Sequence, residues 1–286
     1  MRKTRNSHEN RRLGIGPLPI VVDPAAGVAL AITILSTLFI IGVALAPPAM
    51  LRMLQGEDGV VETVSALAYI AGLFFALRLA GLTRGWSRAH WVMWAILCFT
   101  FFGEETSWLQ HWIGYATPES VKAVNVQSEF NLHNLALFSP DDRVFSGQGI
   151  SFSWKFLMSA QHLFNIGFTA YFLLLPVVML LRPIGNRMRR FGVPQIRLRF
   201  VATVWLPLIV SVALTITERS AEATKALIGE TREMFFALTI MWLIVSAYNS
   251  LLDWKRNAGS MASTRRRSGL PSAVDNARTD TTASSR

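Results

Sequence analysis

The chain has only one cysteine, Cys98, and it lies within an apolar run. A single thiol excludes an intrachain disulfide and a zinc site built from several cysteines, so any metal site would depend on His and carboxylate ligands. The sequence also lacks a Gly-x-Ser-x-Gly elbow, a His-Glu-x-x-His pair, a Walker-type phosphate loop and an Asp-rich diphosphate motif. These absences disfavour the motif-bearing hydrolases and the nucleotide-driven pumps.

Charged residues are scarce, at 16% of the chain, whereas 51% of the residues are hydrophobic. The apolar residues are grouped in long blocks, which is typical of an integral membrane protein. The formal net charge of +10 comes mainly from short basic segments between these blocks, and no nucleic-acid-binding motif is recognisable. Membrane topology therefore explains the charge better than a nucleic-acid partner does.

Six apolar stretches are long enough, or nearly long enough, to cross a bilayer as helices. The first follows basic residues, but it is longer than the apolar part of a signal peptide and is followed by Pro47, so we interpret it as an uncleaved span. The third is short, which predicts that its helix continues through Glu104 and Glu105. The predicted spans are 25–46, 60–82, 89–102, 153–181, 200–217 and 234–252.

The charges between the spans predict the orientation of the chain. The termini and the connections after spans two and four, together with Arg78 near the end of span two, hold 21 Lys/Arg against 5 Asp/Glu, and the remaining connections with their adjoining span ends hold 7 against 13. Because positive residues favour the cytoplasmic side, both termini are expected in the cytoplasm. The sequence thus predicts an all-α membrane helical bundle with about six transmembrane helices, and it places the candidate glutamates on the outer face.

Three parts of the chain are expected to differ in character. Residues 1–24 form a basic cytoplasmic segment, residues 25–254 form the six-span membrane domain, and residues 255–286 form a disordered cytoplasmic tail rich in Ser, Thr, Arg and Ala. A long outer-face loop, 114–152, connects spans three and four. It is too rich in aromatic residues and Leu to be typical of disorder, which favours a functional loop.

Polar residues concentrate between Gly103 and Asn134, where a predicted span ends. Ionisable residues at membrane depth are energetically costly, and they usually pair, line a cavity or take part in chemistry. We therefore predict a pocket at the outer end of the bundle. Its predicted catalytic residues are Glu104, Glu105, Glu129 and His133, its predicted metal ligands are Glu104, His133 and His162, and its other polar residues are Glu62, Gln110, His111, Asn131 and Asn134.

Two spacings support such a pocket. On a continuing helix, Glu104, Trp108 and His111 would share one face, and Glu129 and His133 would share another if their segment were helical. These groups could bind zinc or manganese and activate a water molecule, while another Glu or His moves protons. The alternative is a docked loop whose Asn and Gln side chains cap helix ends and satisfy loop backbone, which requires no ligand.

The two motifs of this stretch are G-E-E-T-S-W-L-Q at 103–110 and N-V-Q-S-E-F-N-L-H-N at 125–134. They resemble the motifs G-E-E-x-S-W-x-Q and N-x-Q-x-E-x-N-x-H-N of a group of uncharacterised bacterial multi-spanning membrane proteins. This chain has Thr106 at the variable position and His111 where an arginine is usual. The resemblance implies a family without an activity. Ceramidase-like membrane hydrolases are similar in site chemistry only, because no His follows His162.

Two functions fit these residues. The first is a membrane-embedded enzyme that acts on a lipid or lipid-linked substrate at the outer leaflet, such as a metal-dependent hydrolase or transferase. The second is a non-catalytic membrane protein that binds a lipid or a partner, or that passes an ion or a small solute. In both, the expected location is a bacterial inner (cytoplasmic) membrane with the functional face periplasmic or extracellular, and the expected partner is membrane lipid.

Overall fold

The computed structural model describes residues 20–47, 59–125, 128–132, 135, 138, 159–217 and 222–267. These residues are mostly helical, which confirms the all-α fold class. The only strands among them are two short ones, β1 (Val21–Val22) and β2 (Gln195–Ile196), which pair in parallel. The chain forms two compact units, Met1–Tyr248 and Asn249–Arg286.

The first unit is a bundle of helices. Its long helices are α2 (Ala26–Ala44), α4 (Val60–Leu82), α5 (Gly85–Glu105), α12 (Leu198–Thr217) and the first part of α13 (Glu222–Arg267), and one further pass consists of α9 (Ala160–Thr169), the π-helical η3 (Ala170–Leu174) and α10 (Leu175–Val178). Its short elements are η1 (Ser107–Leu109), α6 (Gln110–Ile113), α7 (Glu119–Lys122) and α11 (Arg182–Arg190).

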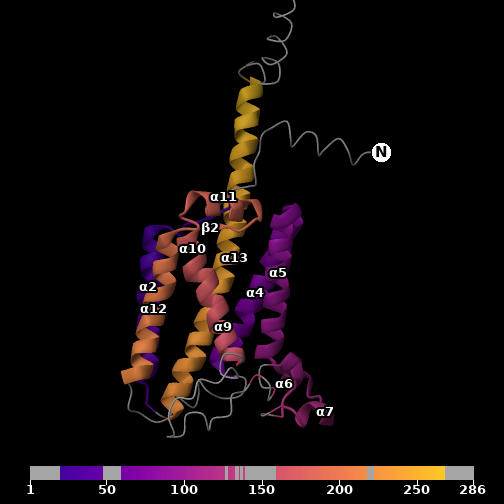
Figure 1. Ribbon diagram of the computed structural model, residues 1–286, viewed down its shortest axis with the longest axis vertical. Coiled ribbons are helices and arrows are strands. Elements are labelled where there is room, and N and C mark those ends of the chain that lie inside the picture. Colours follow the sequence, from indigo (N-terminus) through magenta and orange to yellow (C-terminus); the bar gives the residue numbers. More distant parts are fainter. Residues whose placement is uncertain are drawn as a thin grey trace, which may run out of the picture. The chain divides into compact units, whose positions relative to one another are not determined.

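Successive passes of this bundle run in opposite directions (Figure 1). The C-terminal ends of α2, α5 and α12 therefore lie at the same end as the N-terminal ends of α4, α9 and α13. We call this end, at the bottom of Figure 1, the glutamate end, because it carries Glu62, Glu105 and Glu230. The predicted span 60–82 coincides with α4, and α5 continues through the Glu pair as the sequence predicts.

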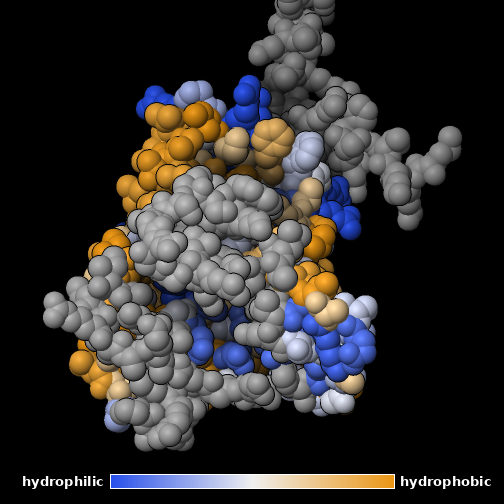
Figure 2. All heavy atoms as spheres, turned by 60° about the horizontal axis from the view of Figure 1, so that its bottom comes forward, coloured by the Kyte–Doolittle hydropathy of each residue, from blue (hydrophilic) through white to orange (hydrophobic). Residues whose placement is uncertain are grey.

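Four described helices are long and apolar enough to cross a membrane, and a shorter apolar helix covers Leu198–Leu214. Their outward side chains are apolar as well, with Leu35 on α2 exposed at 67% and Leu67 on α4 at 60%. Figure 2 shows hydrophobic flanks and a concentration of hydrophilic residues near the glutamate end. Apolar outer surfaces of this kind are consistent with a membrane protein. The four helices are Ala26–Ala44, Val60–Leu82, Ala160–Val178 and Leu227–Ala258.

Aromatic rings pack the middle of the bundle. The ring of Phe168 on α9 lies 4.2 Å from that of Phe236 on α13 and 4.4 Å from that of Phe172 on η3. Phe200 on α12 stacks on Trp242 on α13 at 4.4 Å. Because such ring pairs contribute about 0.5–1.5 kcal/mol beyond their buried area, they hold α13 against α9 and α12.

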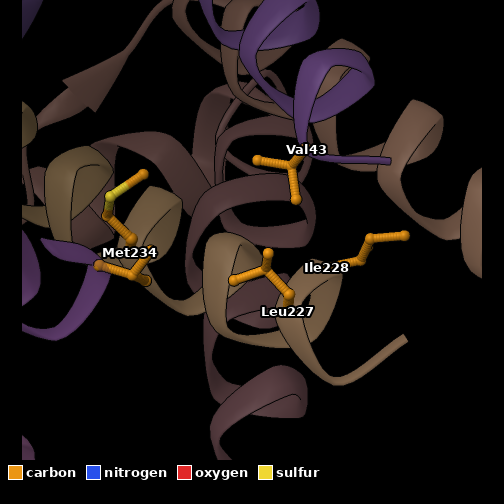
Figure 3. Packing of buried hydrophobic residues seen from close by; sticks show 5 residues of the cluster. Val43, Leu227, Ile228 and Met234 are labelled. Carbon is orange, nitrogen blue, oxygen red and sulfur yellow. The ribbon is translucent and has the colours of Figure 1, made fainter. Parts of the chain in front are cut away.

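An aliphatic cluster closes the bundle near the glutamate end. Val43 from α2 and Val61 from α4 pack with Leu227, Ile228 and Met234 from α13 (Figure 3). These five side chains are all buried. Three helix ends are thereby held together, which places the polar residues beside them at fixed positions.

Pro176 explains the π-helical turn before it. A proline has no N–H, so the carbonyl four residues earlier, that of Phe172, loses its usual helical donor. The indole Nε1 of Trp205 on α12 donates to that carbonyl at 3.3 Å. The same π-helical turn carries Tyr171, whose hydroxyl accepts from Trp94 Nε1 at 3.3 Å and is 3.2 Å from His90 Nε2. These hydrogen bonds link η3 to α5 and α12.

At the opposite end of the first unit, backbone hydrogen bonds join the segment before α2 to the segment before α12. Gln195 N donates to Ile20 O at 2.8 Å, and Arg197 N donates to Val22 O at 3.0 Å. Arg199 Nη1 donates to Pro24 O at 2.8 Å, which ties the start of α12 to the segment before α2. The basic helix α11 belongs to this end as well, so the arginines of α11 lie at the end opposite Glu62, Glu105 and Glu230.

α13 extends beyond the boundary that the sequence predicted. It continues as a helix to Arg267, so residues 255–267 are helical although the sequence predicts a disordered tail from residue 255. Lys, Arg, Ala and Met in this segment are good helix formers. Asp253 and Arg256, which lie one helical turn apart, form an exposed ion pair with 3.9 Å between Oδ1 and Nη1. Residues 1–19 and 268–286 lie outside the described residues.

Candidate functional site

A turn with left-handed backbone follows α5. Ser107, Trp108 and Leu109 have φ angles of 42°, 57° and 68°. L-residues rarely adopt this conformation, which costs roughly 1–2 kcal/mol for each residue. Because the right-handed helix stops before this turn, the helical face that the sequence predicts for Glu104, Trp108 and His111 is wrong.

Trp108 folds back over the last turn of α5. Its Nε1 donates to Glu104 Oε1 at 2.9 Å, and its ring meets Phe99 edge-on at 5.7 Å. A Cβ atom on Gly103 would lie 2.8 Å from the indole. The glycine of the first motif is therefore required for this close packing, which holds the left-handed turn against the helix.

Side chains of the first motif bind the backbone of the second. Glu104 Oε2 accepts from Leu132 N at 2.7 Å, and Gln110 Oε1 accepts from Phe130 N at 2.8 Å. The other end of the Gln110 amide donates to Thr117 Oγ1 at 2.7 Å. The two motifs are thus joined in the fold by hydrogen bonds between residues that lie 20 and 28 positions apart in the chain.

Amide side chains shape the second motif itself. Asn125 Nδ2 donates to Asn131 O at 2.9 Å and to Asn131 Oδ1 at 3.0 Å, and Glu129 N donates to Asn125 Oδ1 at 3.4 Å. Residues 128–132 contain no helix. The docked-loop interpretation therefore describes this segment, and the helical spacing considered for Glu129 and His133 does not apply.

Ser107, Glu129 and Asn131 form a hydrogen-bonded group between the turn and the docked loop. Ser107 Oγ donates to Glu129 Oε2 at 2.8 Å, and Asn131 Nδ2 donates to the same oxygen at 2.8 Å. Ser107 and Asn131 are each only 4% exposed. Sequence reasoning missed Ser107, since neither an elbow motif nor helical periodicity marks it. Its position directly after the Glu pair in the first motif was the available signal.

Glu105 lies among carboxylates from three helices. Its charge interacts with those of Glu62 on α4, Glu104 on α5, and Glu230 and Glu233 on α13. All five residues are partly buried. Ionised carboxylates repel one another, and the repulsion grows as water is excluded. A proton or another positive charge therefore stabilises this group, which we call the carboxylate cluster.

Two members of the carboxylate cluster were not among the predicted site residues. Glu230 and Glu233 lie one turn apart on α13, and Glu230 also interacts with Glu62. Both precede the apolar run that begins at Met234, just as the predicted Glu pair follows the apolar run of α5. That shared position at a span end is the signal that could have found them.

His162 lies in the first turn of α9. Ser159 caps this helix by accepting from His162 N at 3.2 Å, and its hydroxyl also hydrogen-bonds to His162 Nδ1. Among the side chains that the structure describes, no three His, Cys, Asp or Glu are placed to hold a metal ion. His133, Asn134 and the side chain of His111 lie outside the described residues. The zinc or manganese site therefore stays a prediction.

Comparisons with known proteins add no family to these observations. The chain matches no protein-family model, no curated protein and no solved structure. The resemblance to the bacterial multi-spanning group depends on the two motifs and stays a prediction.

Proposed function

We propose that this chain is a membrane-embedded enzyme, a hydrolase or transferase, that acts on a lipid or lipid-linked substrate at the outer leaflet. The observation that carries the proposal is the carboxylate cluster around Glu105, held at one end of an apolar bundle. Strained backbone and interacting ionisable groups concentrate at functional sites. Both features occur here within a few residues of each other.

The proposed topology has six spans, formed by α2, α4, α5, α9–α10, α12 and α13, with both termini in the cytoplasm. The alternating directions of these helices support it, as does the position of the basic helix α11 at the end opposite the glutamates. Because basic residues favour the cytoplasmic side, the carboxylate cluster would face the periplasm or the exterior of a bacterial cell. A lipid could then reach it laterally from the outer leaflet.

In the proposed chemistry, Glu105 acts as the proton-transferring group. It would exchange a proton with the bound substrate or with water during the reaction, a role that carboxylates perform in many enzymes. Four further carboxylates interact with Glu105, and interacting ionisable groups of this kind are frequent at catalytic sites. The predicted zinc or manganese ion, with Glu104, His133 and His162 as ligands, is a separate hypothesis that metal analysis tests.

A second function has its own support in the structure. Four side chains of the two motifs hydrogen-bond within the protein and hold the docked loop in place, and we call them the clamp: Glu104, Gln110, Asn125 and Asn131. In this alternative the clamp shapes an outer surface that binds a lipid or a partner, and the carboxylate cluster lines a path for an ion or a small solute. No catalytic step is then needed.

Lipid turnover by reconstituted protein distinguishes the two functions. The purified full chain would be placed in proteoliposomes of mixed bacterial lipids, and products would be identified by mass spectrometry. We expect Glu105→Gln to reduce turnover by about 10²–10⁴-fold, the usual contribution of an acid–base group. Glu119→Gln is the matched control, because Glu119 is exposed and pairs only with Lys122 in the described structure. Folded wild type that binds lipid without turning over any class would favour the second function.

A further inference from the structure

We propose that Ser107 is a nucleophile and that Glu129 accepts its proton, so that the protein forms an acyl-serine intermediate from an ester-linked lipid. This inference rests on the proposed enzyme function and adds its reacting groups and its substrate class. It assigns a catalytic role to a residue that lies in the first motif but outside the predicted site.

The first support is the geometry of the hydroxyl and the carboxylate. Ser107 Oγ is 2.8 Å from Glu129 Oε2, which is direct proton-transfer distance. Asn131 Nδ2 donates to the same carboxylate oxygen, and the backbone of Glu129 is held in turn by Asn125. A nucleophile beside a base, with a third group that holds the base, is the usual arrangement for covalent catalysis.

The second support is the backbone of Ser107. A helix end needs at most one left-handed residue, usually glycine, to satisfy its last carbonyls. Here three L-residues in succession are left-handed, and the first is the serine that contacts the carboxylate. A capping role alone does not require this arrangement. The serine nucleophile of α/β-hydrolases is likewise held on a sharp, strained turn, which in those enzymes joins a strand to a helix.

The proposed first step transfers the acyl group. Ser107 Oγ attacks the ester carbonyl carbon as its proton moves to Glu129, and the carbonyl electron pair moves to oxygen. When the tetrahedral intermediate collapses, the C–O bond to the lipid alcohol breaks, and the alcohol oxygen takes the proton from Glu129. Water or an acceptor alcohol then attacks the acyl carbon and gives its proton to Glu129. The bond between the acyl carbon and Ser107 Oγ breaks, and Ser107 Oγ takes the proton from Glu129. No oxidant or metal enters this balance.

Covalent labelling tests the pair directly. The full-length protein in lipid nanodiscs would be treated with a small alkyl fluorophosphonate, chosen because Ser107 is nearly buried, and the modified residue would be identified by peptide mass spectrometry. Wild type is expected to be labelled at Ser107. Glu129→Gln keeps an acceptor oxygen for both hydrogen bonds but removes the base, so we expect labelling to slow by about 100-fold or more.

Ser107→Gly separates chemistry from folding. Glycine adopts positive φ without strain, which offsets the lost hydrogen bond to Glu129, so this variant is expected to keep a melting temperature close to that of wild type while losing all label and all lipid turnover. Ser65→Ala is the matched control, since Ser65 is a buried serine whose hydroxyl donates to Val61 O within α4. It should be labelled and active like wild type.

The outcomes also separate this inference from the proposed function. Lipid turnover that persists in Ser107→Gly would overturn the nucleophile and leave the enzyme function standing. Absence of label in wild type, label at another residue, or Glu129→Gln labelled at the wild-type rate would each overturn the inference as well. A further outcome is that Ser107 is labelled in a Glu129-dependent way but the protein turns over no bacterial lipid. This outcome would support Ser107 as the nucleophile and overturn the lipid substrate.

Discussion

Glu104 Oε2 accepts a hydrogen bond from the backbone N–H of Leu132, a residue 28 positions later in the chain. The other oxygen of the same carboxylate accepts from the indole of Trp108. One side chain at the end of α5 therefore positions both the left-handed turn and the docked loop. The Ser107–Glu129 contact depends on this bridge, because its two residues come from the two elements that Glu104 joins.

Replacing Glu104 should release the docked loop. In Glu104→Ala, the donors on Trp108 and Leu132 lose their shared acceptor, which we expect to lower the free energy of unfolding by about 1–3 kcal/mol. Thermal unfolding in detergent, followed by tryptophan fluorescence, measures the effect. Glu119→Ala should unfold like wild type because Glu119 is exposed. Equal melting temperatures for the two variants would contradict the bridging role.

Gly103→Ala should disturb the turn through a different contact. The added methyl group would lie 2.8 Å from the Trp108 ring, which Glu104 and Phe99 hold in place. Overpacking of this kind costs about 1–3 kcal/mol. Gly167→Ala is the control, since no atom lies within 4 Å of its added methyl and alanine favours the helix. A Gly103 variant as stable as the Gly167 variant would show that the tryptophan can move aside.

Tyr171→Phe should weaken the contact between η3 and α5. The phenylalanine keeps the ring packing but leaves Trp94 Nε1 without its acceptor and removes the contact to His90. Loss of such buried hydrogen bonds costs about 1–3 kcal/mol. Hydrogen exchange of α5 and the melting temperature report the change. Tyr248→Phe is the comparison, because it preserves the ring contact with Phe75. A smaller drop in melting temperature for Tyr171→Phe than for Tyr248→Phe would refute the prediction.

Chelation should separate a serine nucleophile from a metal-activated water. Because Ser107 and Glu129 are protein groups that need no ion to react, fluorophosphonate labelling is expected to continue unchanged in EDTA. The metal content of wild type and His133→Ala, measured by mass spectrometry, provides the complementary result. One zinc or manganese ion per chain that is lost together with His133 and with turnover would instead favour the metal-dependent mechanism.

Much of the fold could be predicted because it depends on local composition. The apolar run 60–82 is long, contains only two charged residues, Glu62 and Arg78, and is framed by Gly59 and Thr83, and α4 has the same bounds. The short third run implied a helix that continues through the Glu pair, and α5 does so. By contrast, a span-end position marks Glu230 and Glu233 as candidates, but only the tertiary structure shows that their helix end meets the end that carries Glu105.

The sequence by itself determined the apolar helices, the polar stretch between them and the two motifs, because hydrophobic length and residue type act locally. Only the tertiary structure decided the left-handed turn at Ser107. That backbone is unfavourable for L-residues and exists because Gly103 admits Trp108, and because Glu104 and Glu129 bind the turn and a loop more than twenty residues away. Long-range contacts thus offset a local conformational cost, and they bring Ser107 and Glu129 together.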